Sequence, residues 1–246
     1  MKRALVLLAL PLALVGCSGG KLRVDAASSL TEVFQRLAPK AQFDFAGSDE
    51  LAFQLEQGAK ADVYASASRK YPEKLYRDKL VEKPRVFATN TLVLIVPRGN
   101  PGRVTGLGSL MRKRVKLVIG AKGVPVGDYT RKVLAGFCRS IFLSPGAKCP
   151  AARIVSEEQD VKGVVAKVAL GEADAGFVYV TDVKPAAGKV VVISNLGGRL
   201  PFEPTVKYEI AVVRGAKHRN AAERFVALVT GPRGRAALVK AGFGLP

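Results

Sequence analysis

The sequence is poor in the residues that most hydrolases and metal proteins use for chemistry. Its 246 residues include a single histidine, His218, and three cysteines, Cys17, Cys138 and Cys149. This supply excludes a zinc site built from His and Cys and an HExxH motif, and it leaves only His218 for a catalytic triad. His218 lies in the polar stretch Ala-Lys-His-Arg-Asn, where we expect it to be solvated. No nucleophile is paired with a base, so the sequence predicts a protein that is not an enzyme.

Acidic residues are scarce as well. Lys and Arg number 39 against 20 Asp and Glu, which gives a formal net charge of +19. Such a charge raises the question of nucleic-acid binding. The basic residues are scattered, however, and aromatic residues make up only 7% of the chain and do not alternate with arginine for base stacking. We therefore expect no nucleic-acid partner and a solvated basic surface, whose field attracts small anions.

Apolar runs of membrane-spanning length are absent, and the longest apolar run stands at the beginning of the chain. Lys2 and Arg3 precede Ala4–Val15, which is shorter than the roughly 20 residues of a membrane-spanning helix and is typical of a signal peptide. The wording Leu-Val-Gly-Cys at 14–17 resembles a bacterial lipobox, in which the chain is cut before a cysteine that carries a lipid. A plain signal peptide cut near Gly19 is the alternative. We expect a signal peptide over 1–16, a tether over 17–20, lipidation at Cys17, and a protein exported and held at the cell envelope.

The other two cysteines follow from this interpretation. If Cys17 is lipidated, Cys138 and Cys149 remain in an oxidising compartment, where a disulfide closing their short loop is expected. Two unpaired buried thiols are the alternative.

Strand and helix patterns alternate along the rest of the chain, which predicts an α/β protein with mostly parallel sheets. The strand patterns cover residues 22–26, 42–46, 62–66, 91–96, 117–119, 177–180, 190–193 and 208–213. Helix patterns cover 49–57, 71–76 and 128–137, and three more begin at capping boxes. These boxes pair Ser29 with Glu32, Ser156 with Gln159, and Asn220 with Glu223.

Four strand–turn–helix junctions share small or polar turns. They fall at 27–29, at 46–48, at 124–127 and just before Val161. A helix start presents unpaired N–H groups and a partial positive charge, so several starts that converge form an anion site without a charged side chain. Ser29 and Ser48 can equally be plain N-caps, and Tyr179 can equally be a core residue whose hydroxyl ends a strand.

Several long motifs carry a resemblance to a known family. VDAASSLTEVF is followed by FAGSDELAFQLEQGAKADVYASA and then by NTLVLIVP, GVPVGDYT, EEQDVKGVVAKVALGEADAGFVYVTD and KYEIAVV. In this order they resemble the bacterial molybdate-binding proteins of ABC importers over nearly the whole mature chain. The resemblance implies a two-lobed type II periplasmic-binding-protein fold with two chain crossovers and a central ligand cleft. Lobe 1 would hold 21–88 plus 205–246, and lobe 2 would hold 89–204.

The resemblance also implies the ligand and the residues that hold it. The hydroxyls of Ser29, Ser48 and Tyr179 and the backbone N–H groups of Val126 and Val161 would bind molybdate. Tungstate has the same charge and shape and would bind as well. The implied function is high-affinity capture of this anion and its delivery to an ABC permease, by a monomer with no cofactor and no metal beyond the oxyanion.

The chemistry of the residues agrees with this expectation. Molybdate carries no proton at neutral pH and needs only donors, whereas hydrogen phosphate also needs an acceptor for its proton. Three residues depart from the family: Val126 replaces the usual alanine, Asp49 follows Ser48, and Asp25 has no assigned role. Asp49 would complement its helix start or, turned inward, would favour phosphate.

Other functions also fit the sequence. A receptor for sulfate, thiosulfate or phosphate would have the same fold. An enzyme acting on phosphorylated envelope substrates and a lipoprotein that holds an anionic polymer through its charge belong to different classes.

Overall fold

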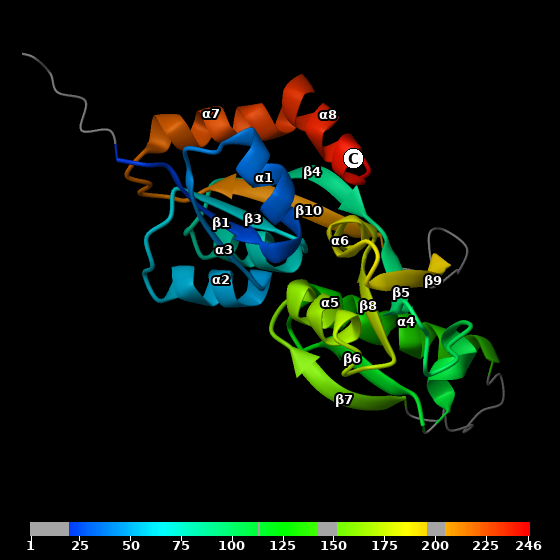
Figure 1. Ribbon diagram of the computed structural model, residues 1–246. Helices are drawn as coiled ribbons and strands as arrows, with labels where there is room; N and C mark the ends of the chain where they lie inside the picture. Colours follow the sequence, from blue (N-terminus) through cyan, green and yellow to red (C-terminus); the bar gives the residue numbers. More distant parts are fainter. Residues whose placement is uncertain (1–19, 113, 142–151, 196–204) are drawn as a thin grey trace, which may run out of the picture.

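The computed structural model describes residues 20–112, 114–141, 152–195 and 205–246. Two mixed β-sheets, each covered by helices, form two lobes that lie side by side (Figure 1). The α/β class predicted from alternating strand and helix patterns is confirmed. The expectation of mostly parallel sheets is wrong, because one strand in each sheet pairs antiparallel with both of its neighbours.

Lobe 1 contains the first sheet, whose strand order is β2-β1-β3-β10-β4. β1 (Arg23–Ala27), β2 (Gln42–Ala46) and β3 (Val63–Ser66) are parallel. β10 (Val206–Val212) lies antiparallel between β3 and β4 (Arg85–Asn90). The strand added from the far end of the chain therefore becomes an inner strand of this sheet.

Helices cover both faces of this sheet. α1 (Thr31–Leu37), α7 (Arg219–Thr230) and α8 (Pro232–Ala241) share one core, in which the rings of Phe34 and Phe225 meet edge to face at 5.2 Å. α2 (Ser48–Glu56) and α3 (Lys70–Arg77) pack on a separate cluster around Tyr64. In Figure 1, α7 and α8 form the top of the molecule.

Lobe 2 contains the second sheet, with strand order β7-β6-β8-β5-β9. Its strands are β5 (Leu92–Pro97), β6 (Lys116–Gly120), β7 (Arg153–Glu158), β8 (Ala175–Tyr179) and β9 (Val190–Asn195). β6, β7 and β8 are parallel, and β5 is antiparallel to β8 and β9. Its helices are α4 (Pro125–Ile141), α5 (Val161–Ala169) and the short α6 (Val180–Val183), with 3-10 turns η2 (Leu107–Met111) and η3 (Lys184–Ala186).

The chain passes between the lobes twice. Thr91 is the one residue between β4 in lobe 1 and β5 in lobe 2, and the chain returns between β9 and β10. One buried apolar cluster extends from Phe34 in lobe 1 to Val118 in lobe 2. Leu92 and Val206, at the described ends of the two passages, both belong to this cluster, so we take the two passages as the hinge between the lobes.

All three predicted capping boxes are wrong. Ser29 lies in a 3-10 turn, η1 (Ser28–Leu30), and Ser156 lies inside β7, while α5 begins with Asp160 as its N-cap. α7 begins one residue before Asn220, with no side-chain cap. Ser29 and Glu32 contact Tyr208 and Lys162 instead of each other, and the hydroxyl of Ser156 donates to Glu158 within β7. The strand pattern at 85–90 and the edge strand β7 were also not predicted.

The expectation that His218 is solvated is wrong too. Its side chain is 15% exposed, and its Nδ1 lies 2.9 Å from Oδ2 of Asp62. Asp62 also accepts from the backbone N–H groups of His218 and Arg23. The contact joins the turn before α7 to the residue just before β3, across 156 residues of sequence, and the bond from Arg23 ties the same carboxylate to the start of β1.

The proposed signal peptide and Cys17 lie outside the described residues, as does Cys149. No helix among the residues the structure describes has the length and apolarity to cross a membrane.

Candidate functional site

A small cavity lies between the lobes at the ends of β1, β2 and β8 and the starts of α2, α4 and α5. All five residues expected to bind the anion line it, and they come from both lobes. The full lining is Ala27, Ser28, Ser29, Ala46, Gly47, Ser48, Ala67, Val124, Pro125, Val126, Asp160, Val161 and Tyr179. The converging junctions predicted from the sequence therefore meet at one place.

Ser48 begins α2 and is 1% exposed. Its Oγ accepts a hydrogen bond of 3.1 Å from the backbone N–H of Ala67, which follows β3. Its carbonyl accepts one from the hydroxyl of Tyr64. With an acceptor position of Oγ filled by a backbone group, the hydroxyl proton of Ser48 is free to be donated into the cavity.

Ser29 lies in η1, directly after β1, and is 4% exposed. Its Oγ lies 2.8 Å from the hydroxyl of Tyr208, on β10. Ser29 therefore joins the cavity to the strand by which the chain returns to lobe 1.

Tyr179 ends β8 and faces the cavity from lobe 2. Its hydroxyl is buried and has no hydrogen-bond partner among the described residues. Burial raises the pKa of this hydroxyl well above its usual value, so it stays protonated at neutral pH. A buried hydroxyl without a partner costs free energy, and an anion in the cavity would accept a hydrogen bond from it.

The starts of α4 and α5 complete the cavity. A side chain on Gly127, in the first turn of α4, would come within 2.2 Å of the carbonyl of Gly120, so only glycine lets α4 begin this close to β6. Val126 and Val161 stand in the first turns of the two helices, where N–H groups have no partner within the helix. Both helix starts therefore offer donors and a partial positive charge to the cavity.

Among the described residues, no lysine or arginine lines the cavity, and its one carboxylate is that of Asp160. This carboxylate accepts from the N–H of Gly163 at 2.8 Å as the N-cap of α5. Asp49 is absent from the lining, and its carboxylate lies beside Gly47 and Gly123. Burial raises the pKa of Asp49, although backbone N–H groups near it act in the opposite direction. Hydroxyl and backbone donors thus dominate the site.

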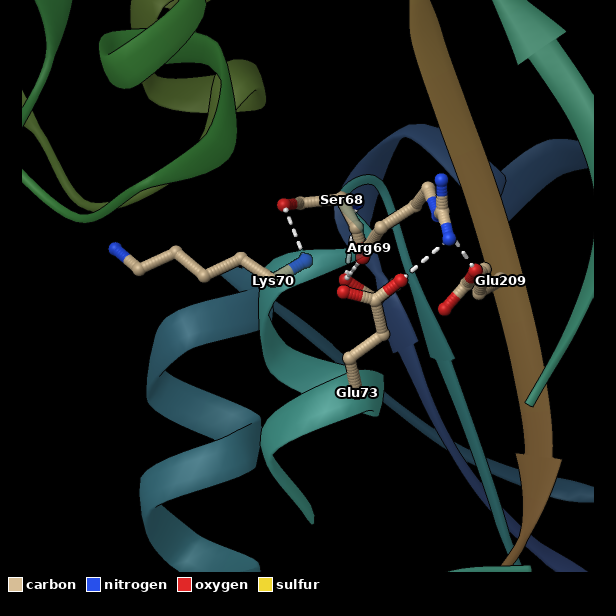
Figure 2. A network of polar contacts seen from close by, with 6 residues as sticks. Ser68, Arg69, Lys70, Glu73 and Glu209 are labelled. Carbon is tan, nitrogen blue, oxygen red and sulfur yellow. Dashed lines mark hydrogen bonds and ion pairs between the residues drawn. The ribbon is translucent and has the colours of Figure 1, made fainter. Parts of the chain in front are cut away.

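Polar contacts hold the lobes together around the cavity. The hydroxyl of Tyr71, on α3, donates to the carbonyl of Gly123 before α4 at 2.6 Å. Lys70 pairs with Asp128 at 3.4 Å, and Lys162 pairs with Glu32. Figure 2 shows the Lys70 side chain extending toward the green ribbon of lobe 2. These contacts require the closed arrangement of the lobes.

Arg69, next to Lys70, keeps the beginning of α3 in place within lobe 1. Its guanidinium contacts Glu73 at 2.6 Å and the buried Glu209 at 3.0 Å (Figure 2). Glu209 follows Tyr208 on β10, so this ion-pair network ties the base of α3 to the same strand that contacts Ser29.

Sequence reasoning missed the residues that support the site. Ala67 positions Ser48, Tyr208 contacts Ser29, and Asn90 reaches Tyr208 from the end of β4. These contacts join residues 19 to 179 positions apart, so no local pattern signals them.

The chain is similar to known binding proteins along nearly its whole length. The molybdate-binding protein ModA of Mycobacterium tuberculosis is 37% identical over 235 residues, which cover 91% of this chain and 84% of that protein. The periplasmic molybdate-binding protein of Azotobacter vinelandii has a similar structure, with a TM-score of 0.74, 22% identity, and coverage of 92% of this chain and 100% of that one. The sulfate-binding protein SubI of M. tuberculosis shares the fold, with a TM-score of 0.73, 14% identity, and coverage of 92% and 86%. Residues 22–244 match the model of one family, and the chain belongs to it: the bacterial extracellular solute-binding proteins.

Proposed function

We propose that this protein captures molybdate with high affinity outside the cytoplasm and delivers it to an ABC permease. The observation that carries the proposal is the interlobe cavity, where Ser29, Ser48 and Tyr179 stand beside two helix starts and where the described lining includes no basic side chain. Its similarity to ModA of M. tuberculosis supports the same ligand. The protein performs no covalent chemistry in this role.

The five proposed ligand residues supply donors and no acceptor for a ligand proton. The hydroxyls of Ser29, Ser48 and Tyr179 and the N–H groups of Val126 and Val161 suit an anion that carries no proton. Molybdate and tungstate are such anions, and we propose that both bind. Neutral donors also avoid the large desolvation cost of burying a cation in the cavity.

Phosphate is the less favoured alternative because Asp49 does not line the cavity, and the carboxylate of Asp160, which does, already accepts from the N–H of Gly163 as the N-cap of α5. Sulfate is also a proton-free dianion, and the size of the cavity must distinguish it from molybdate. Val126, which is 1% exposed, forms the cavity wall at the start of α4 together with Val124 and Pro125.

The remaining expectations belong to the same proposal. A signal peptide over 1–16 and a lipid on Cys17 would hold the mature protein at the cell envelope as a monomer. Lobe 1 would hold 21–88 plus 205–246, and lobe 2 would hold 89–204. Cys138 is disulfide-bonded, which supports its pairing with Cys149.

The test is calorimetric titration of the chain from Ser18 with molybdate, tungstate, sulfate and phosphate in turn. We expect one-to-one binding of the first two. Ser48→Ala removes a hydrogen bond to a charged ligand, worth about 1.5–3 kcal/mol, and should weaken molybdate binding by roughly 10- to 150-fold.

Ser109→Ala is the matched control, because Ser109 is a buried serine on η2 that does not line the cavity. Its affinity should equal that of the unaltered protein. Binding of sulfate or phosphate alone would contradict the molybdate assignment and keep the fold.

A further inference from the structure

Behind Ser29, a chain of buried hydrogen bonds runs through the hinge. Asn90, at the end of β4, and Tyr208, on β10, are 6% and 0% exposed. The Nδ2 of Asn90 lies 3.3 Å from the hydroxyl oxygen of Tyr208, and that hydroxyl lies 2.8 Å from Oγ of Ser29. These hydrogen bonds thus connect the first passage between the lobes, strand β10 and the cavity.

The direction of these hydrogen bonds can be derived from Asn90. Its Oδ1 accepts from the backbone N–H of Thr91 at 2.9 Å, and a backbone amide cannot reverse this role. The NH₂ group of Asn90 must therefore face Tyr208 and Thr181, whose Oγ1 lies 2.9 Å away. Since an amide NH₂ only donates, the hydroxyl oxygen of Tyr208 is an acceptor in this contact.

Among the contacts that the structure describes, the hydroxyl of Tyr208 then has one acceptor to which it can donate, which is Oγ of Ser29. If Ser29 donated to Tyr208 instead, the tyrosine oxygen would accept twice and its own buried proton would have no acceptor in the described contacts. Leaving a buried donor unsatisfied is costly. Ser29 therefore accepts from Tyr208 and keeps its own proton for the cavity.

We propose that Asn90 and Tyr208 form a polarised relay that fixes Ser29 as a hydrogen-bond donor and so selects anions that carry no proton. Both are positioning residues, since the cavity lining includes Ser29 and neither of them. The relay rests on the proposed function of the cavity and adds to it a source of discrimination against protonated oxyanions.

Two features support the relay. Burial raises the pKa of Tyr208 well above its usual value, so its hydroxyl retains the proton it donates. The ring of Tyr208 is also held in place by edge-to-face packing on Phe87 and Phe243, whose ring centroids lie 6.1 Å and 5.3 Å from its own. Ser48 reaches the same polarity by another route, because the backbone N–H of Ala67 already donates to its Oγ.

The relay is tested by reversing it. In Asn90→Asp the side chain accepts only, so Tyr208 turns its proton away from Ser29, and Ser29 then donates to Tyr208 and presents lone pairs to the cavity. We expect molybdate affinity to fall by about 10- to 150-fold, the range for losing a hydrogen bond to a charged group. Inorganic phosphate at pH 7 should gain measurable affinity in the same variant.

Tyr208→Phe separates the relay from the added charge. We expect this variant to bind molybdate about tenfold more weakly than the unaltered protein. Its preference for molybdate over phosphate should also be smaller. In the Tyr208→Phe background, Asn90→Asp should cost several-fold less than in the unaltered protein, because only the effect of the added charge remains once the hydroxyl is missing. Thermal unfolding checks that each variant is folded, and if Asn90→Asp is not, Tyr208→Phe alone still tests the selectivity.

The outcomes are distinct. An equal penalty for Asn90→Asp in both backgrounds, or an unchanged preference over phosphate in Tyr208→Phe, overturns the relay while unaltered protein still binds molybdate. Failure of the unaltered protein to bind molybdate overturns the proposed function itself.

Discussion

Asp25 is a buried carboxylate, and the effect of its charge on the free energy of unfolding can be estimated. It lies on β1, is 7% exposed, and stands in register with Asp44 on β2 and Tyr64 on β3. Burial raises the pKa of Asp25 to about 7, and the negative charge of Asp44 acts in the same direction. The raised pKa of Asp25 affects the stability of the protein and requires no role in binding.

The sign of the effect follows from proton binding. Between about pH 4 and pH 7 the folded state holds a proton on Asp25 that the unfolded state has lost, so the free energy of unfolding falls as pH rises through this range. An asparagine side chain is not charged at any pH; we therefore expect Asp25→Asn to stabilise the protein by roughly 1–3 kcal/mol at pH 8 and by much less at pH 4. Urea unfolding at the two pH values measures this difference.

The control is Asp44→Asn, which removes the second charge from an exposed edge strand. It should reduce the same pH dependence by a smaller amount. An Asp25→Asn variant whose stability matches that of the unaltered protein at both pH values would contradict the prediction.

At the scale of elements, the helix starts supply N–H donors and partial positive charge to the cavity. α5 is the clearest case, because its N-cap, Asp160, has an extended backbone with φ −154° and ψ 176°. This is the conformation that a residue before proline adopts, and proline is favoured at the first position of a helix. The N–H of Val161 can therefore be deleted without disturbing the start of the helix.

Val161→Pro should weaken molybdate binding by about 10- to 150-fold, because it removes one hydrogen bond to a charged ligand. Val161→Ala keeps the N–H and removes a similar part of the apolar side chain, so it should bind more tightly than the proline variant. Calorimetric titration of both variants gives the comparison. Equal affinities would show that this backbone group does not contact the anion.

Elements with a strong local pattern were predictable from the sequence. The run LVLIVP at β5 is buried at every position, and Val161, Val164 and Val168 on α5 repeat at helical spacing and are buried. β7 was missed because its outer residues Ile154 and Val155 are exposed at the sheet edge and its Ser156 mimics a helix cap. The five cavity residues came from motifs, whereas Tyr208 and Asn90 depend on contacts that only the folded chain creates.

At the scale of the whole molecule, closure is stabilised by a few contacts between the lobes. Tyr71 donates from α3 to the carbonyl of Gly123, and this bond is lost when the lobes separate. A net hydrogen bond contributes about 0.5–1.5 kcal/mol, so Tyr71→Phe should weaken molybdate binding by roughly two- to tenfold. The loss should appear as faster dissociation, measured by stopped-flow displacement of the anion.

The control for this variant is Tyr76→Phe, on the same helix and 40% exposed. It should leave the affinity unchanged. The thermal midpoint of Tyr71→Phe without anion should also match that of the unaltered protein, because the bond serves the closed form. A lower midpoint would mean that Tyr71 supports lobe 1 rather than closure.

The position of β10 has a consequence for the order in which the chain can fold during synthesis. The second sheet is complete once residues 92–195 have been made, since all five of its strands lie within that stretch. The first sheet must wait for residues 206–212, because β10 separates β3 from β4. Until then two strand edges lie open in lobe 1, and open edges invite pairing with other chains. A nascent chain of this protein is therefore most exposed to aggregation, and most in need of a chaperone, in the interval between finishing lobe 2 and receiving its last strand.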